Sequence, residues 1–312
     1  MKKTNLTLAL AGLMIASAAI VSSCKKKDAT TTTPAKDTDQ SGASANNTAE
    51  NTSNDIVSMG AQASDNTSSG SLSTYRNGNS NQILGGSCAT ITRDTASKVI
   101  TLTFNGSSPC LDGRTRSGTI VYTYSNSVVG AKHYRDPGFQ LDVTSSNYVV
   151  DGNAVTIISK TIKNTTAVGF NPATTNVTWE VKANISITLA SGAGTINWTS
   201  DRIKTLLNTS STYPANPVAN PINWPSAKIG ITDGSGGTSG SRSTGETFSV
   251  TITNQLVRDF GGCDIGGKRP FIQGTFIYAP AGKYTRTVDY GSGTCDLNAT
   301  VTIDGVTYNI TI

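Results

Sequence analysis

The feature that most constrains the fold of this chain is a strict alternation of apolar and polar residues with a period of two. The clearest example is residues 177–189, where polar side chains alternate with Val177, Trp179, Val181, Ala183, Ile185, Ile187 and Leu189. Successive side chains of a β-strand point to opposite faces of a sheet, so this stretch is predicted to be a long strand with one buried face. No stretch shows helical spacing with capping residues, which favours an all-β fold.

Shorter stretches with the same alternation recur throughout residues 86–312. Their inward positions are Ile100, Leu102 and Phe104; Ile120, Tyr122 and Tyr124; Val155, Ile157 and Ser159; Phe248, Val250 and Ile252; Val301 and Ile303; and Tyr308, Ile310 and Ile312. Asp-Gly pairs at residues 151–152 and 304–305 separate such stretches, and this dipeptide readily adopts the positive φ angles of tight hairpin turns. Residues 86–312 are therefore predicted to form an antiparallel β-sandwich or a pair of stacked sheets.

The N-terminus has the form of a secretory signal. Lys2 and Lys3 precede an apolar stretch at residues 6–21, which is too short for a membrane-spanning helix and ends in small residues. Residues 21–24, Val-Ser-Ser-Cys, resemble the bacterial lipobox, in which the cysteine is lipidated and becomes the mature N-terminus. This resemblance implies a signal peptide at residues 1–23 and a lipid on Cys24. An ordinary signal peptide with an unmodified cysteine is the alternative.

The residues after Cys24 bear on where the protein resides. Residues 24–28, Cys-Lys-Lys-Lys-Asp, resemble the start of many Bacteroidota lipoproteins, which implies a lipid anchor in the outer membrane. Two or three acyl chains suffice for stable membrane attachment. Surface display in that phylum is associated with an acidic run after the cysteine, whereas residues 25–27 are lysines. The periplasmic face and the cell-surface face therefore both stay open.

Residues 24–85 are rich in Thr, Ser, Asn, Asp, Ala and Gly. Large apolar residues are rare there and are limited to Ile56, Val57, Met59, Leu72, Tyr75, Ile83 and Leu84. Such a segment buries too little apolar surface to offset the roughly 1–2 kcal/mol per residue that backbone ordering costs. We therefore expect residues 24–85 to be a disordered tether that holds the β domain away from the membrane.

Four of the five cysteines lie beyond the lipobox, and secretion exposes them to a compartment in which disulfides form. Four cysteines allow three pairings. Residues 103–110 resemble residues 288–295, because each ends in a cysteine with another cysteine upstream across two predicted strands. This weak internal two-fold similarity predicts the disulfides Cys88–Cys110 and Cys263–Cys295. The alternative, a metal site, lacks the Cys-x-x-Cys or Cys/His spacing that metal binding needs.

The same region resembles a group of uncharacterised Bacteroidota outer-membrane-type lipoproteins that combine a Cys-Lys-Lys-Asp start with two further elements. The first element is Cys-x-Asp-Gly-Arg, which is residues 110–114 here. The second is Asp-Tyr-Gly-x-Gly-x-Cys-Asp, which is residues 289–296. The resemblance covers most of residues 86–312, concerns the fold and implies no activity.

Side chains suited to catalysis or metal binding are scarce. His133 is the sole histidine, so a second histidine for a zinc site is missing, and no Gly-x-Ser-x-Gly turn is present. A glycosidase needs two carboxylates, and residues 86–312 contain only two glutamates, Glu180 and Glu246, while the acid-rich local elements are Asp259 with Asp264 and Asp289 with Asp296. Glu180 falls on the outward face of the predicted strand, and Asp beside Gly is typical of turns. We therefore expect no catalytic residue, no metal site and no cofactor.

Aromatic side chains are the best candidate contacts, because exposed Trp and Tyr stack on sugars and anchor partners. Trp179 and Trp198 alternate with apolar neighbours and are expected in the core. Tyr213 and Trp224 belong to a segment, residues 213–225, whose four prolines exclude a central strand. The segment is predicted to be an ordered, exposed loop. A loop that presents Trp224 to a ligand and a loop that folds it over the sandwich both fit this pattern.

Residues 94–96, Asp-Thr-Ala, resemble the Bacteroidota acceptor for O-glycosylation. The resemblance makes Thr95 a candidate glycosylation site, and a plain hairpin turn is the alternative.

The formal net charge is +5 at pH 7, and the basic residues are scattered along the chain. With the predicted compartment, this pattern argues against nucleic acid as a partner.

Together these features favour a non-catalytic cell-envelope lipoprotein with a structural or ligand-binding role. Its expected partners are the membrane, through the lipid on Cys24, and a glycan or another envelope protein. A carbohydrate-binding module that uses Trp224 and Tyr213 is the main alternative. A glycoside-active enzyme is the third.

Overall fold

β-Strands account for most of the residues that the structure describes, which in this computed structural model are 37–65, 83–84, 88–128, 133–190, 192–217, 220, 222–265 and 269–312. Among these residues, 13 strands form a single antiparallel sheet whose spatial order follows the order of the chain. The strands are β1 (Ala89–Asp94), β2 (Val99–Asn105), β3 (Arg116–Asn126), β4 (Phe139–Val150), β5 (Asn153–Asn164), β6 (Thr178–Thr188), β7 (Thr195–Leu206), β8 (Lys228–Ser241), β9 (Thr247–Asp259), β10 (Gln273–Pro280), β11 (Arg286–Ser292), β12 (Asn298–Ile303) and β13 (Val306–Thr311).

The predicted all-β antiparallel fold is confirmed, and the buried faces of the strands follow the alternation. In β6, Trp179 and Val181 are buried, whereas Lys182 on the other face is exposed. Both predicted Asp-Gly turns have positive φ angles, 50° and 79° at residues 151–152 and 47° and 73° at residues 304–305. Hydrogen bonds connect all the strands into one sheet.

The two disulfides have the predicted pairing. The Cys88–Cys110 bond encloses β1 and β2, and the Cys263–Cys295 bond encloses β10 and β11. Each bond therefore closes a loop that contains one two-stranded hairpin, as the internal similarity predicts. In the chain-entropy account, a loop of this size adds roughly 3–4 kcal/mol of stability by restricting the unfolded chain.

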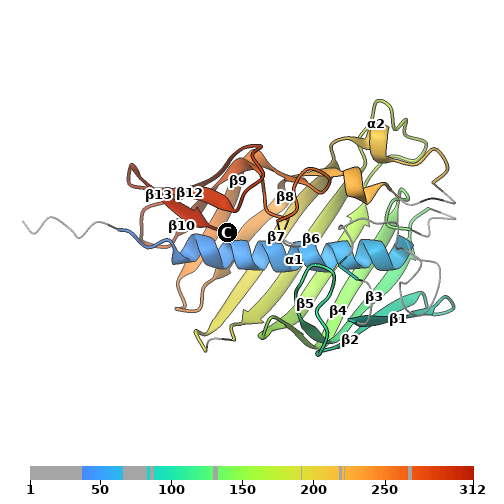
Figure 1. The fold of residues 1–312 in the computed structure, drawn as a ribbon, viewed down its shortest axis with the longest axis horizontal. Helices are drawn as coiled ribbons and strands as arrows, with labels where there is room; N and C mark the ends of the chain where they lie inside the picture. Colours follow the sequence, from blue (N-terminus) through green and yellow to red (C-terminus); the bar gives the residue numbers. More distant parts are fainter. Residues whose placement is uncertain are drawn as a thin grey trace, which may run out of the picture. The chain divides into compact units, whose positions relative to one another are not determined.

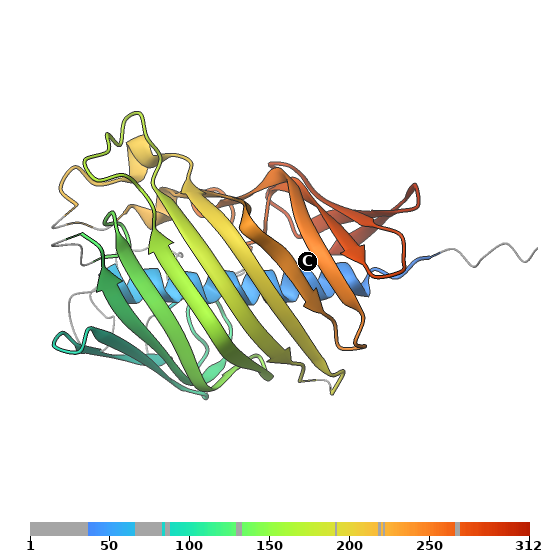
Figure 2. The ribbon, with the colours of Figure 1, turned by 180° about the vertical axis from the view of Figure 1, so that it is seen from behind.

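The prediction of a disordered tether over residues 24–85 is wrong for the part that forms helix α1 (Ser41–Asp65). This helix lies on one side of the sheet and crosses the strands, beginning near β10 and ending near β3 and β1 (Figures 1 and 2). Helix and sheet belong to one structural unit, residues 37–312. The predicted signal peptide and the tether residues 24–36, 66–82 and 85 lie outside the described residues.

Burial against the sheet explains why a segment of this composition is helical. The large apolar residues of the predicted tether that the structure describes are all buried: Ile56, Val57, Met59, Ile83 and Leu84. At Gly60, a Cβ atom would lie 2.6 Å from Cε1 of Tyr122, so the helix approaches β3 too closely for a side chain there. Most helices in proteins are stabilised by such packing rather than by their own propensity. The composition of the segment alone does not reveal this packing against the sheet.

Candidate binding cleft beside helix α1

One face of α1 docks on the sheet through buried polar groups. The bonds run from Trp198 Nε1 to Asn46 Oδ1 (2.9 Å), from Arg202 to Glu50 Oε2 (3.0 and 3.1 Å), from Lys160 Nζ to Ser53 Oγ (2.6 Å) and from Tyr122 Oη to the Ile56 carbonyl (2.8 Å). Buried polar groups are costly unless they are hydrogen-bonded. These contacts, spread over β3, β5 and β7, therefore fix both the position and the rotation of the helix.

A second polar face of α1 lines a cleft of about 500 Å³, which we call the α1 cleft. The helix contributes Asn47, Asn51 and Asp55, and the facing wall comes from the end of β9 and the segment that follows it. The side chains of that wall are Arg258, Phe260, Arg269 and Phe271, and Asp112, Arg114 and Asp151 lie at one end. A smaller hollow of about 40 Å³ shares Ser58, Phe260 and Arg269 with the cleft and adds Lys204 and Trp224.

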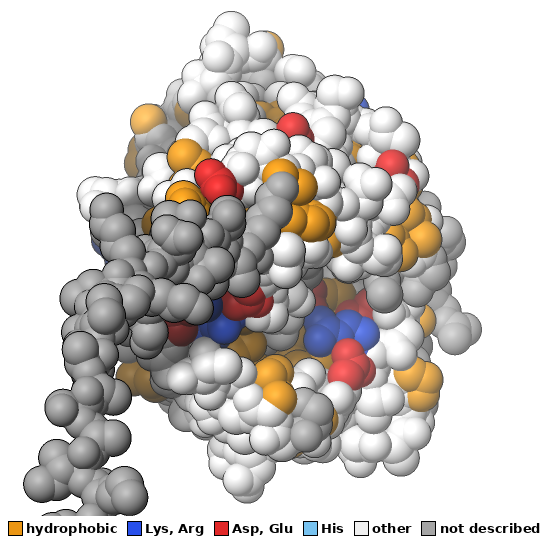
Figure 3. Space-filling model, turned by 90° about the vertical axis from the view of Figure 1, so that its left-hand side faces the viewer, with side chains coloured by type: hydrophobic (Ala, Val, Ile, Leu, Met, Phe, Trp, Pro, Cys, Tyr) orange, Lys and Arg blue, Asp and Glu red, His pale blue; other side chains and the backbone are white. Residues whose placement is uncertain are grey.

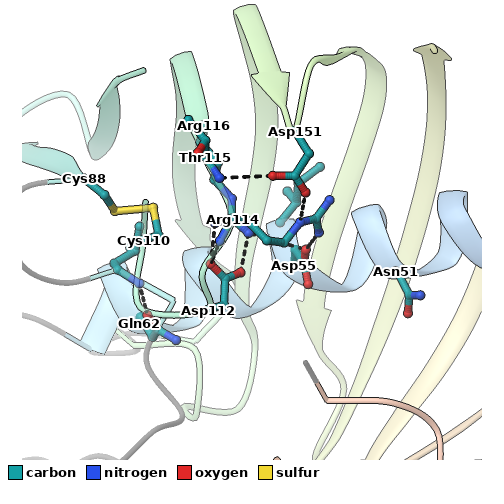
Figure 4. Close-up of polar contacts among 12 residues, drawn as sticks. Asn51, Asp55, Gln62, Cys88, Cys110, Asp112, Arg114, Thr115, Arg116 and Asp151 are labelled. Carbon is teal, nitrogen blue, oxygen red and sulfur yellow. Dashed lines mark hydrogen bonds and ion pairs between the residues drawn. A yellow bond between two sulfur atoms is a disulfide. The ribbon is translucent and has the colours of Figure 1, made fainter. Parts of the chain in front are cut away.

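At one end of the cleft, Arg114 and Arg116 form ion pairs with three carboxylates, although Arg116 Nε is buried without a hydrogen-bond partner among the described residues (Figure 4). Arg116 is buried and donates two hydrogen bonds to Asp112, at 2.8 and 2.6 Å. Arg114 donates to Asp151 at 2.7 Å and also pairs with Asp55 of α1. Bidentate and multiply bonded arginines of this kind hold their partners in one geometry. This end of the cleft is therefore a rigid wall.

The facing wall of the cleft is basic, and its charges are less well matched. Arg258 is 6% exposed, donates to Asn51 and stacks over the Phe271 ring, with 4.5 Å between its Cζ atom and the ring centroid. Arg269 lies 5.8 Å from the Phe260 ring centroid and 3.4 Å from Asp264 Oδ2. The Nε atoms of both arginines are buried and lack a hydrogen-bond partner among the described residues. Unsatisfied donors of this kind are rare in proteins.

Two buried lysines lie under the helix on the inward faces of β5 and β7. Burial lowers the pKa of Lys160 to about 7. Burial also lowers the pKa of Lys204 well below its usual range, and repulsion by Lys160 and Arg258 adds to the effect. Lys204 lines the smaller hollow and forms no ion pair with any residue that the structure describes. Viewed from the end at which α1 begins, basic side chains lie in a hollow of the surface with acidic ones beside them (Figure 3).

The Pro-rich segment is ordered over residues 213–217, 220 and 222–225, and it follows the one-turn helix α2 (Thr209–Thr212). Trp224 begins a short 3-10 helix (Trp224–Ser226) and is half-buried, with its ring 5.8 Å from that of Tyr134 and 6.2 Å from that of Trp179. Tyr213, also half-buried, packs on Phe170 instead. Trp224 thus both covers the core, in which Trp179 and Trp198 are buried as predicted, and lines the small hollow.

Most of the residues considered for catalysis lie apart from the cleft, whereas Asp264 pairs with Arg269 of the facing wall. His133 Nδ1 is 3.2 Å from Asp136 within a turn, and Glu180 pairs with Lys182 on the outward face of β6. Glu246 pairs with Arg242 and Lys283, while Asp259, Asp289 and Asp296 each accept a hydrogen bond from the backbone N–H group of a residue two or three positions later. Among the described residues, no group of three His, Cys, Asp or Glu side chains converges as a metal site would require.

Of the two predicted modification sites, the structure describes Thr95 but not Cys24. Thr95 is exposed in the turn between β1 and β2, where Asp94 accepts hydrogen bonds from the Ala96 and Ser97 backbone N–H groups. Asp94 therefore has a turn-forming role whether or not Thr95 carries a glycan. Cys24 lies outside the described residues. Within the described part of the chain, no helix has both the length and the apolar character needed to cross a membrane.

Sequence reasoning identified Trp224 but missed the basic side of the cleft. The signal was present in β7, where Arg202 and Lys204 share the inward face with Ile196 and Trp198. A charged residue on the buried face of a strand requires a partner or a site.

The scan against protein-family models and the comparisons with curated proteins and with solved structures find no match to this chain.

Proposed function

We propose that this chain is a non-catalytic, lipid-anchored protein of the outer membrane that binds a small ligand in the α1 cleft. The observation that carries the proposal is the cleft itself, in which polar groups from α1 converge with two arginines and two aromatic rings on the facing wall. Ligand sites are concave and combine apolar surface with a few fixed polar groups. This geometry and the N-terminal motif support the proposed role as a ligand-binding lipoprotein.

Preorganisation of the cleft supports a binding role. The helix wall is held by Glu50 and Asp55, which pair with arginines of the sheet region, and the facing wall is held by the Cys263–Cys295 disulfide. A site whose walls are already fixed loses little conformational entropy when a ligand binds. The cleft can therefore bind a small molecule without a large rearrangement.

The proposed lipid on Cys24 would limit the distance between the membrane and the start of the binding unit. Residues 25–36, twelve in all, separate Cys24 from the described unit that begins at Asp37. Even a fully extended chain of that length spans only about 40 Å. The first residue of the described unit, Asp37, would therefore lie within that distance of the lipid headgroups.

Replacing Cys24 by Ala is expected to move the protein from the membrane fraction to the soluble fraction, because the acyl chains supply most of the membrane affinity. Fractionation and immunoblotting of cells that express each form measure the change. Ser44→Ala, at an exposed position of α1, serves as the control and should leave the protein in the membrane fraction. Unchanged fractionation of the Cys24 variant would contradict the anchor.

Ligand binding in the α1 cleft is tested by filling it. Ser58 lines both hollows, so Ser58→Trp should occupy the space that a ligand needs. Native mass spectrometry of protein extracted gently from its envelope is expected to show a bound small molecule in the wild type and none in this variant. Ser44→Trp, at an exposed position of the same helix that does not line the cleft, should retain it. Loss from both variants, or retention by both, would remove the cleft as the site.

A carbohydrate-binding module remains the second candidate, and one observation favours it. Trp224 and Phe260, both half-buried, line the small hollow beside the cleft, and aromatic faces of this kind stack on sugar rings. In this version of the proposal the ligand is a glycan fragment and Tyr213 does not contribute, because it packs on Phe170.

A further inference from the structure

We propose that the ligand of the α1 cleft carries an oxyanion, a phosphate or carboxylate group, and that Arg258, Arg269 and Lys204 bind it. The inference rests on the proposed function and specifies the chemistry of the ligand. It follows from a surplus of buried positive charge on one side of the cleft.

The acids around the cleft are already engaged elsewhere. Asp112 is held by both terminal nitrogens of Arg116, and Asp151 by Arg114. Asp55 pairs with Arg114 and lies 3.5 Å from Arg116. These three carboxylates therefore form ion pairs with Arg114 and Arg116. None of the three carboxylates pairs with Arg258, Arg269 or Lys204.

Arg258 is the strongest indication of a missing anion. It is 94% buried, since 6% of its surface is exposed, and its guanidinium stays charged at any physiological pH. Its contacts are a neutral amide, Asn51, and an aromatic ring, Phe271, and its Nε atom has no partner among the described residues. Buried charges in proteins are paired or bind ligands, because desolvation of an isolated charge is expensive.

Arg269 and Lys204 extend the same basic surface. The Arg269 side chain is 9% exposed, and its buried Nε atom also lacks a partner among the described residues. Lys204 is 7% exposed and projects from β7 into the hollow that Arg269 shares. Burial lowers the pKa of Lys204, the cations Lys160 and Arg258 lower it further, and the acids Glu50 and Asp55 oppose the shift only partly. Arg269 already pairs with Asp264, but it lines both the cleft and the smaller hollow, so an oxyanion bound beside it can also compensate Arg258 and Lys204.

The geometry of the guanidinium groups suits an oxyanion more than a neutral ligand. Arginine presents several N–H donors in one plane, which match the oxygens of phosphate or carboxylate. The ring stacking of Arg258 on Phe271 and of Arg269 on Phe260 fixes the planes of both groups. A volume of about 500 Å³ exceeds what a lone phosphate fills, so the oxyanion is part of a larger small molecule.

Calorimetric titration of the full-length mature protein in detergent tests this inference with three probes: inorganic phosphate, galacturonate and galactose. The two sugars differ at a single carbon, which is a carboxylate in one and a hydroxymethyl group in the other. Saturable binding of phosphate or galacturonate, at least tenfold tighter than that of galactose, is expected. Dioctanoyl phosphatidylglycerol identifies the source: tighter binding than inorganic phosphate assigns the oxyanion to a lipid headgroup, and weaker binding to a free molecule.

Lys204→Met separates a binding role from a structural one. Removal of a buried lysine without an ion-pair partner should raise the melting temperature, whereas the affinity for the oxyanion should fall at least tenfold. Arg258→Gln should weaken binding similarly, and Arg242→Gln, outside the cleft and paired with Asp39 and Glu246, should not change it. Unchanged affinity in the Lys204 and Arg258 variants would overturn the inference.

The failure of the inference and the failure of the proposed function give different results. If galactose binds as tightly as galacturonate and Ser58→Trp abolishes both, the cleft is a ligand site but the oxyanion is wrong. If no probe binds and the wild type carries no small molecule that Ser58→Trp removes, both are wrong.

Discussion

Glu50→Ala is expected to lower the free energy of unfolding by about 3 kcal/mol, although the residue belongs to a segment whose composition suggests a tether. Glu50 is 3% exposed and accepts two hydrogen bonds from Arg202, which is 2% exposed on the inward face of β7. Without Glu50, the buried guanidinium retains one carboxylate, Asp233. The loss therefore lies near the lower end of the range for breaking a buried ion pair. Urea denaturation followed by circular dichroism measures it.

A matched control separates burial from charge. Glu180 pairs with Lys182 at 2.8 Å on the outward face of the neighbouring strand, where solvent screens the interaction. Glu180→Ala should therefore change stability by less than about 0.5 kcal/mol. The double variant Glu50→Leu with Arg202→Met should recover much of the loss, because neither charge is left buried. Equal effects of the Glu50 and Glu180 variants would show that α1 does not dock on the sheet as described.

The sheet could be predicted because the sequence patterns that specify its strands and turns are local. Each strand alternates within its own sequence, and the two Asp-Gly pairs adopt positive φ angles whatever lies elsewhere in the chain. The disulfides could be predicted for the same reason, since each encloses one hairpin. The helix could not, because its stability comes from partners more than 60 residues away, such as Tyr122 for Ile56 and Arg202 for Glu50.

The candidate site depends on α1 and was hidden for the same reason. The Pro-rich context makes Trp224 a candidate contact but leaves open whether it covers the core or faces a ligand; in the structure it packs on Trp179 and also lines the smaller hollow. Asn51 and Asp55 were assigned to the tether, so the arginines that meet them, Arg258 and Arg114, had no visible partners. Charged residues on inward strand positions, such as Arg202 and Lys204, were the available signal that something polar covers that face.

The same docking gives the protein an unusual dependence of stability on pH. Lys160 is 3% exposed beneath α1, and burial lowers its pKa from 10.5 to about 7, while Glu50 opposes the effect in part. Between pH 7 and 10.5 the unfolded chain keeps the proton that the native state has released. Stability therefore rises with pH across this window, and the cost of burying the charged lysine is fully present below pH 7.

Lys160→Met should remove that cost. The interval between 10.5 and about 7 corresponds to about 5 kcal/mol, so the variant is expected to gain up to that amount below pH 7. The gain should shrink steadily as the pH rises toward 10. The measurement is the difference in unfolding free energy between variant and wild type from pH 6 to 9.5, in which contributions from groups that do not interact with Lys160 cancel.

Lys163→Met is the matched control, because Lys163 lies on the same strand but is exposed on the opposite face. It should change stability by less than about 0.5 kcal/mol at every pH. A stability difference for Lys160→Met that does not vary with pH would show that Lys160 keeps its ordinary pKa. It would then have to reach water, and the contact between β5 and Ser53 of α1 would be looser than the 2.6 Å hydrogen bond implies. A gain that disappears with rising pH instead ties the burial of this charge to the docking of α1, the element that also forms one wall of the cleft.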